Sequence, residues 1–479
     1  MVLLYHGGGG VYYSLLSVYP ISVILRAAPT GVGYLYVLSG FVMSLVYFRP
    51  KEKFNILGYW STRFIRLYPL YIVSFLLVCY YYIDFVARVK PQKTLANIFI
   101  LQAWIPSYAQ SFNYASWSMT VEIFFYAIFP FFTIWAYRQS TKKLIWLSIV
   151  LWTISQVVYH VLWIGYYPEY RYFLVYFPPF HLNSFIMGVV GGIWFLREGQ
   201  GQEVKPRIIL SILAGALLFA LVYTVASSAY PQLPHALQPM AGLLAPVLIL
   251  IIVALAMDKS RLSVFLNRPA LVTLGETAYA LYILHVPIIW IYERALENSS
   301  LTHPRLVFEY TALPLMIGVG LFAHFYIDQP LRAWLKKILK RVSMPLLILD
   351  LVIVAASVYI SFRLRFGDGK EFLSYRATVL LMFWSAFLLR TILSTIVNAL
   401  NPSSLYGTFM QFARPVLISV TVGSAALAGI VFTVYSLGHF ENFPRSVFVM
   451  DWVLVLGLSL AVRFLFRYFG IYKQNPAPA

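Results

Sequence analysis

The chain has 479 residues, of which 61% are hydrophobic and only 11% are charged. Because a soluble globular domain carries about 25% charged residues, this composition excludes a soluble enzyme. The net charge of +19 lies mainly in basic loops between apolar stretches, which is typical of cytoplasmic loops and not of a nucleic-acid-binding surface. We therefore expect contact with membrane lipid and no nucleic acid partner.

Apolar segments of about 20 residues recur along the whole sequence, which predicts helices that cross a membrane. Lipid admits only helices and closed barrels, and the alternating pattern of a barrel strand is absent. We predict an all-α, polytopic integral membrane protein of about fourteen transmembrane helices, ten followed by four. The first begins at Met1, and the others cover 30–48, 67–87, 117–137, 144–163, 180–197, 208–226, 239–257, 276–296, 306–327, 344–363, 376–398, 415–437 and 446–466.

The loops between these spans carry unequal charge. Loops rich in lysine and arginine alternate with loops that carry few charged residues, and the segment 227–238 carries no charge at all. By the positive-inside rule, this alternation places both termini in the cytoplasm. The segment 328–343 is basic and amphipathic, so we predict that it lies along the membrane surface and separates two domains, 1–335 and 344–470.

Few ionisable side chains lie inside the predicted spans. Glu122 lies roughly 8 Å along its span and His285 roughly 14 Å along another, so both fall in the middle half of the membrane. A carboxylate at the bilayer centre costs about 2.5–3.5 kcal/mol, which favours a functional role. His6 lies in the first span, while Arg63 and Arg66 are one helical turn apart at the predicted inner end of theirs.

These residue types suit the transfer of a group from a phosphate-bearing donor. Two guanidinium groups match phosphate oxygens, a buried histidine can take a proton from an acceptor hydroxyl, and a carboxylate can orient or stabilise that histidine. Simpler interpretations remain open. The arginines can anchor lipid headgroups, Glu122 can pair with a neighbouring Arg, Tyr or His, and His285 can bond a backbone carbonyl. His6 can be an interfacial residue. The single cysteine, Cys79, excludes a cysteine-based metal site, and we predict no metal.

Five segments, taken in order, resemble the acyltransferase 3 family of membrane O-acyltransferases, and they are 31–41, 63–71, 117–130, 275–285 and 328–332. The resemblance covers roughly residues 1–335. It implies an acyl-coenzyme A donor on the cytoplasmic side, no permanently bound cofactor, and an acceptor hydroxyl on a glycan or lipid-linked sugar. It implies that His6 is catalytic, with support from Glu122 or His285. The donor-binding residues that we predict with it are Arg63, Arg66, Ser39, Trp117, Ser118, Tyr126 and Tyr282.

The sequence departs from this family at its start. The family also has an arginine about three helical turns before the histidine, whereas five residues precede His6. We expect the natural start to lie upstream. The segment from Asp350 to Arg365 and that around Asp451 resemble a four-helix membrane domain of polysaccharide-biosynthesis dehydratases and epimerases. No dinucleotide-binding fingerprint follows it, so we predict no NAD.

The prediction is a multi-pass enzyme of the bacterial cytoplasmic membrane that moves an acyl group, which we expect to be acetyl, from acyl-coenzyme A to a surface glycan or its lipid-linked precursor. We expect glycan-assembly enzymes as partners. Two alternatives stay open, because intramembrane ionisable groups also fit a flippase for a lipid-linked sugar, and a shortened first span also fits a non-catalytic scaffold.

Overall fold

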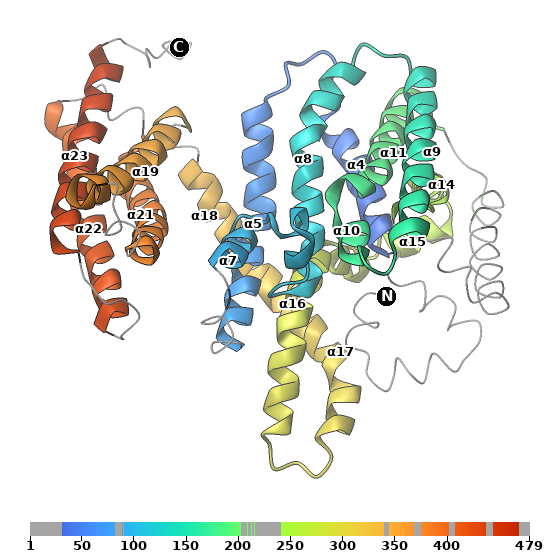
Figure 1. The fold of residues 1–479 in the computed structure, drawn as a ribbon. Helices are drawn as coiled ribbons and strands as arrows, with labels where there is room; N and C mark the ends of the chain where they lie inside the picture. Colours follow the sequence, from blue (N-terminus) through green and yellow to red (C-terminus); the bar gives the residue numbers. More distant parts are fainter. Residues whose placement is uncertain are drawn as a thin grey trace. The chain divides into compact units, whose positions relative to one another are not determined.

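The computed structural model describes residues 31–81, 91–202, 241–339, 344–367, 375–401, 408–436 and 444–468, with isolated positions at 89, 208, 212 and 215. The described residues form helices and turns and no strand, which confirms the all-helical class (Figure 1). Within them, nine helices are long and apolar enough to cross a membrane, and three shorter apolar helices accompany them. The predicted first span, and nearly all of the one over 208–226, lie outside the described residues. The chain divides into two compact units, Met1–Arg332 and Ala333–Ala479.

The first unit is built from helices of very different length. The long ones are α5 (Ile56–Tyr81), α8 (Trp117–Ala136), α9 (Thr141–Tyr166), α16 (Pro269–Glu297) and α17 (Pro304–Phe322). The shorter ones are α4 (Gly31–Tyr47), α7 (Pro91–Ile98), α10 (Arg171–Tyr176), α11 (Leu182–Trp194), α14 (Ala245–Ala256) and α15 (Arg261–Leu266). Single turns join them, namely η2 (Gln102–Trp104), η3 (Pro106–Tyr108), η4 (Tyr114–Ser116), η5 (Pro178–His181), η6 (Phe195–Gly199) and η8 (Ala323–Asp328).

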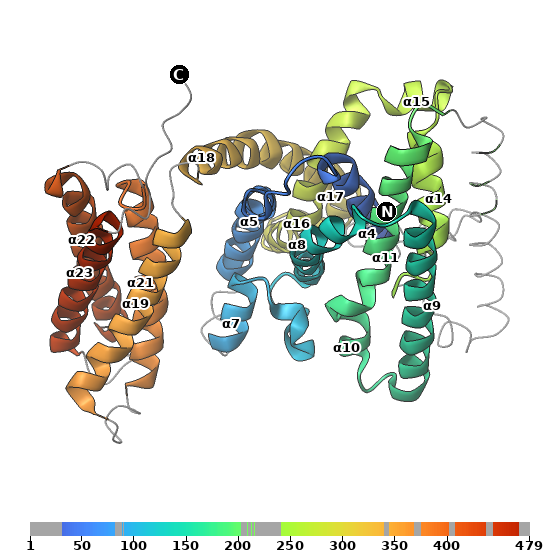
Figure 2. The same ribbon diagram turned by 90° about the horizontal axis from the view of Figure 1, so that it is seen from above.

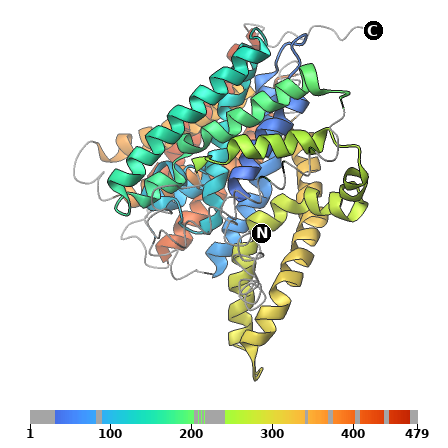
Figure 3. The same cartoon turned by 90° about the vertical axis from the view of Figure 1, so that its right-hand side faces the viewer.

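The core of this unit lies where α4, α5, α8, α11 and α16 meet, because the largest cluster of buried apolar side chains comes from these helices. α4 packs against α11, and both helices contact α14 (Figure 2). α16 and α17 run side by side as a hairpin (Figure 3). α18 (Gln329–Leu339) contains the division between the two units and carries the basic, amphipathic sequence noted above.

Glycine lets α4 and α11 approach backbone to backbone. A Cβ atom added at Gly188 on α11 would overlap the carbonyl oxygen of Val37, and one added at Gly40 on α4 would overlap that of Phe185. Small residues at such spacing are the usual means by which membrane helices come into close contact. The Ser44 hydroxyl adds a hydrogen bond of 3.0 Å to the Val189 carbonyl oxygen. This contact fixes the position of α4 along α11.

Gly188→Ala is therefore expected to destabilise the protein by about 1–3 kcal/mol, because the added methyl group meets backbone atoms that cannot rotate away. Gly33→Ala makes the same chemical change on α4, where a Cβ meets nothing within 4 Å, and should leave stability unchanged. Thermal unfolding in detergent measures both. Equal midpoints for the two variants would show that α4 and α11 do not pack as described.

The second unit is a four-helix bundle of α19 (Met344–Phe366), α21 (Arg376–Ile396), α22 (Phe409–Ser436) and α23 (Arg445–Tyr468). Each helix packs against two others, in the circular order α19, α21, α22, α23. Arg390 on α21 forms a salt bridge with Asp451 on α23, and neither side chain is more than 2% exposed. Ser357 on α19 donates to Asp451 at 2.7 Å, and Arg390 donates to Ser424 on α22 at 2.7 Å. One polar network thus joins all four helices.

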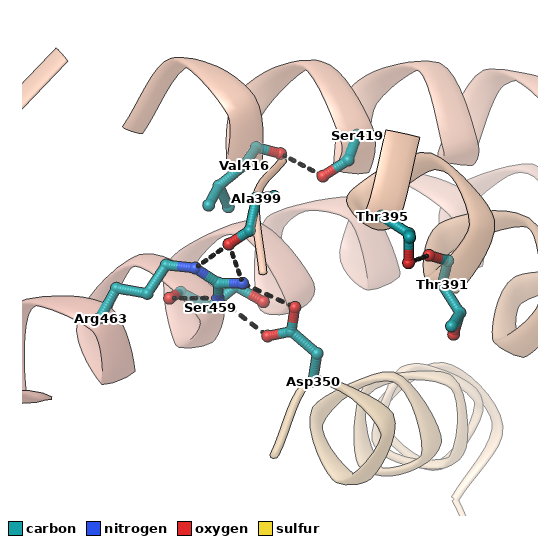
Figure 4. Close-up of polar contacts among 8 residues, drawn as sticks. All are labelled: Asp350, Thr391, Thr395, Ala399, Val416, Ser419, Ser459 and Arg463. Carbon is teal, nitrogen blue, oxygen red and sulfur yellow. Dashed lines mark hydrogen bonds and ion pairs between the residues drawn. The ribbon is translucent and has the colours of Figure 1, made fainter. Parts of the chain in front are cut away.

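A second buried ion pair lies in the same bundle. Two guanidinium nitrogens of Arg463 bind the two carboxylate oxygens of Asp350, at 2.8 and 2.7 Å (Figure 4). Arg463 also donates to the carbonyl oxygens of Ala399 and Ser459. A buried guanidinium is tolerated when its charge is compensated and its N–H groups are bonded, as here. Two of these paired residues, Asp350 and Asp451, lie in the segments whose sequence resembles the four-helix membrane domain of polysaccharide-biosynthesis enzymes.

Candidate functional site

A cavity of about 240 Å³ lies among α4, α5, α8 and α16 of the first unit. Seven of the predicted site residues line it, namely Ser39, Arg63, Arg66, Ser118, Glu122, Tyr126 and Tyr282. Apolar side chains, Leu35, Val42, Met43 and Met119 among them, complete the wall. The cavity therefore combines two cations, a carboxylate and several hydroxyl groups with an apolar surface, which is the composition of a site for an amphipathic ligand.

Glu122 lies on α8, one turn before Tyr126, so their side chains share a face of the helix. The Tyr126 hydroxyl donates a hydrogen bond of 2.7 Å to the Glu122 carboxylate, and Ser39 on α4 supplies a second. The guanidinium groups of Arg63 and Arg66 on α5 lie within electrostatic range. The carboxylate is thus held by two hydroxyl groups and faces two cations across the cavity.

Aromatic rings hold Arg63 in place. Its guanidinium lies 5.1 Å from the ring centre of Tyr47, 5.8 Å from that of Tyr126 and 6.0 Å from that of Tyr59. It donates to the Tyr47 hydroxyl at 2.7 Å. Cation–π contacts position a guanidinium without neutralising it.

Neither arginine of the cavity forms a salt bridge with a described residue. The buried Nε of Arg63 has no hydrogen-bond acceptor among the described residues. Arg66 lies at the exposed side of the cavity. The pair is available to an anionic ligand, and guanidinium forks match phosphate oxygens in particular.

The hydroxyl groups of Ser118 and Tyr282 lie at another part of the cavity wall, 2.8 Å apart. Each also lies within hydrogen-bond distance of the Ala115 carbonyl oxygen, at 3.1 and 3.0 Å. This joins the start of α8 to the middle of α16, so the two hydroxyl groups are fixed relative to Glu122.

Pro130 explains how α5 and α8 are joined beside the cavity. Pro130 has no N–H group, so the carbonyl of Tyr126, four residues earlier on α8, loses its partner within the helix. The indole N–H of Trp60 on α5 donates to that carbonyl at 3.0 Å. A cross-helix bond thus replaces the missing helical one, between the segments that carry Arg63 and Glu122.

The same arrangement recurs on α16. Pro287 frees the carbonyl of Ile283, and two buried side chains donate to it, Ser74 at 2.9 Å and Asn113 at 2.8 Å. Asn113 precedes η4 and caps that turn by accepting from the Ala115 N–H at 3.0 Å. One asparagine therefore connects α16 to the segment that begins α8.

Two predicted site residues, His285 and Trp117, lie apart from the cavity lining. His285 is buried, and its Nδ1 lies 2.5 Å from the Tyr282 carbonyl oxygen. It follows Tyr282 by three residues on α16, which begins at Pro269 and not at the predicted residue 276. Trp117 packs against the rings of Tyr176 and His181. His6 lies outside the described residues.

Three further residues with polar side-chain groups, which the sequence did not single out, also line the cavity, and they are Tyr36, Glu276 and Tyr279. The Tyr279 hydroxyl donates to the Leu67 carbonyl at 2.5 Å and so joins α16 to α5. Tyr36 lies three residues before Ser39 on the same face of α4. That spacing relative to a predicted residue is the one signal in the sequence that would have found Tyr36.

Comparison with known proteins gives a consistent result. Residues 1–327 match the family model described as an acyltransferase domain. The chain is 26% identical over 278 residues to the acyltransferase MdmB of Streptomyces mycarofaciens, a match that covers 54% of this chain and 67% of that protein. It is 25% identical over 328 residues to the peptidoglycan O-acetyltransferase OatA of Listeria monocytogenes, covering 63% and 51% respectively.

The O-acetyltransferase OatA of Staphylococcus aureus is 24% identical over 279 residues, covering 54% of this chain and 45% of that protein. The chain thus spans about half the length of the OatA proteins that it matches. No solved structure matches the chain significantly.

Proposed function

Since the chain belongs to the acyltransferase 3 family, we propose that it transfers an acetyl group from acetyl-coenzyme A to a hydroxyl group of a surface glycan or lipid-linked sugar. The observation that carries the proposal is the cavity that brings the guanidinium groups of Arg63 and Arg66, which form no salt bridge with a described residue, within electrostatic range of the Glu122 carboxylate. Its relatives named as O-acetyltransferases support the choice of acetyl and of an oxygen acceptor.

In this proposal Arg63 and Arg66 bind the phosphate groups of the donor. The thioester then extends along the apolar wall toward Glu122. The acceptor hydroxyl loses its proton as its oxygen bonds to the acyl carbon, the carbon–sulfur bond breaks, and the thiolate takes up a proton. We assign proton removal to His6 and stabilisation of the resulting positive charge to Glu122, which is the division of roles in other histidine–carboxylate pairs.

The donor is expected to enter from the cytoplasm, because coenzyme A esters are cytoplasmic and the two arginines follow the basic segment that begins at Arg49. This orientation places both chain termini in the cytoplasm of a bacterial cell. The acceptor is then reached through the membrane-embedded side of the cavity.

The donor assignment is tested by comparing two thioesters that differ in phosphate content. Acetyl-coenzyme A should be used roughly 10- to 100-fold more efficiently than acetyl-pantetheine, which has no phosphate, because charge-assisted hydrogen bonds to the arginines are lost. The double variant Arg63→Gln, Arg66→Gln should lose most of this preference. The measurement is incorporation of radiolabelled acetyl into membrane glycans. Label transfer at equal efficiency from both thioesters by the wild type would contradict the donor assignment.

A further inference from the structure

Tyr36 presents a hydroxyl group for which the described residues supply no partner. The residue lines the cavity, yet only 3% of its surface is exposed. Its hydroxyl oxygen is buried, and no hydrogen-bond partner for it exists in the part of the chain that the structure describes. Buried hydroxyl groups in proteins nearly always have a partner, so this one calls for an explanation.

The ring of Tyr36 is held firmly. It meets Phe125 edge-on, with ring centres 5.1 Å apart, and His181 in the same manner at 5.4 Å. The backbone of α4 is fixed against α11 through Gly40 and Gly188. The phenol therefore has no free rotation by which to reach water, and its direction is set before any ligand arrives.

The surroundings of this hydroxyl select the kind of partner. The phenol lies within electrostatic range of the Tyr282 hydroxyl and of the Glu122 carboxylate. An anionic oxygen beside Glu122 would be repelled, and the cations that attract phosphate lie on α5. A neutral oxygen that accepts a hydrogen bond fits this position.

We propose that the Tyr36 hydroxyl donates a hydrogen bond to an uncharged oxygen of the bound substrate. The proposal rests on the acyl-transfer function given above, in which two such oxygens reach the cavity, the carbonyl oxygen of the acetyl thioester and the acceptor hydroxyl. Tyr36 is then a substrate-binding residue that selects for a polar group at this position. A ligand that lacks the oxygen would leave the phenol unpaired and would bind less well.

The test compares two tyrosines, one that lines the cavity and one that does not. Tyr159 on α9 is 0% exposed and also has a buried hydroxyl without a partner among the described residues, but it does not line the cavity. Tyr36→Phe and Tyr159→Phe each remove one such hydroxyl. Both should keep or raise the unfolding temperature of the substrate-free protein. Tyr36→Phe should lower kcat/KM by roughly tenfold or more, while Tyr159→Phe stays within about twofold.

Two assays distinguish the oxygens. Hydrolysis of acetyl-coenzyme A in the absence of acceptor reports on the thioester alone, and transfer to glycan reports on both substrates. A loss in both assays assigns Tyr36 to the thioester carbonyl, and a loss in transfer only assigns it to the acceptor. Unchanged rates in both assays for Tyr36→Phe would overturn the proposal. A wild type that consumes no acetyl-coenzyme A would instead overturn the acyl-transfer function, and the proposal with it.

Discussion

Glu122→Gln is expected to lower the rate of acyl transfer by about 10²–10⁴-fold, the range that a group participating in proton transfer contributes. The amide has the shape of the carboxylate and can still accept from Tyr126, so the fold should be kept. What is lost is the negative charge that faces Arg63 and Arg66 and that stabilises a protonated histidine. The measurement is the turnover rate for labelled acetyl at saturating acetyl-coenzyme A.

Glu276 provides the matched control for this prediction. It is the other acidic residue that lines the cavity, but it is exposed. Glu276→Gln makes the same chemical change and should leave turnover within about threefold, because an exposed charge is screened by water. If both variants lose turnover equally, the net charge of the cavity matters and the position of Glu122 does not. If Glu122→Gln turns over normally, the carboxylate has no part in the chemistry.

The second large effect concerns stability. Asp451→Asn is expected to lower the free energy of unfolding by about 3–5 kcal/mol, because the guanidinium of Arg390 is left buried without its counter-charge. The amide is nearly isosteric with the carboxylate, so packing changes little. Unfolding of the protein in mixed micelles by a denaturing detergent measures the loss.

A paired substitution tests the cause of that loss. Arg390→Met combined with Asp451→Leu removes both charges and should recover most of the stability, since apolar side chains replace buried ion pairs at little cost. A double variant as unstable as Asp451→Asn would show that the hydrogen bonds to Ser357 and Ser424, and not the unpaired charge, are what the bundle requires.

The sequence predicts the helices well where apolar residues alone define them. α8 was expected over 117–137 and covers Trp117–Ala136, because nothing polar interrupts its later turns. α5 was expected over 67–87 and covers Ile56–Tyr81 instead. Hydropathy assigns the two arginines to a loop, whereas both lie within α5, where they line the cavity and where Arg63 contacts tyrosine rings. Such compensation comes from other helices and is invisible along a single segment.

The residues of the candidate site show the same contrast between what the sequence predicts and what it cannot predict. Glu122 stands out in the sequence because a carboxylate in an apolar helix needs a reason, and the arginines stand out because they are one turn apart. Tyrosine gives no such signal in a chain with 36 of them, so Tyr47 and Tyr279 could not be told apart from core residues, and only the spacing from Ser39 points to Tyr36. Hydropathy places the start of the helix that carries His285 at residue 276, whereas α16 begins at Pro269, because proline is favoured at the first position of a helix.

The bond from Trp60 to the carbonyl freed by Pro130 has a consequence for how the enzyme can evolve. It ties the cationic and acidic walls together, so neither slides without breaking a buried bond. A variant that accepts a bulkier acyl chain must therefore gain its room from the facing pair, α4 and α16. Substitutions on α4 and α16 can then reshape the cavity while Arg63 and Glu122 keep their spacing.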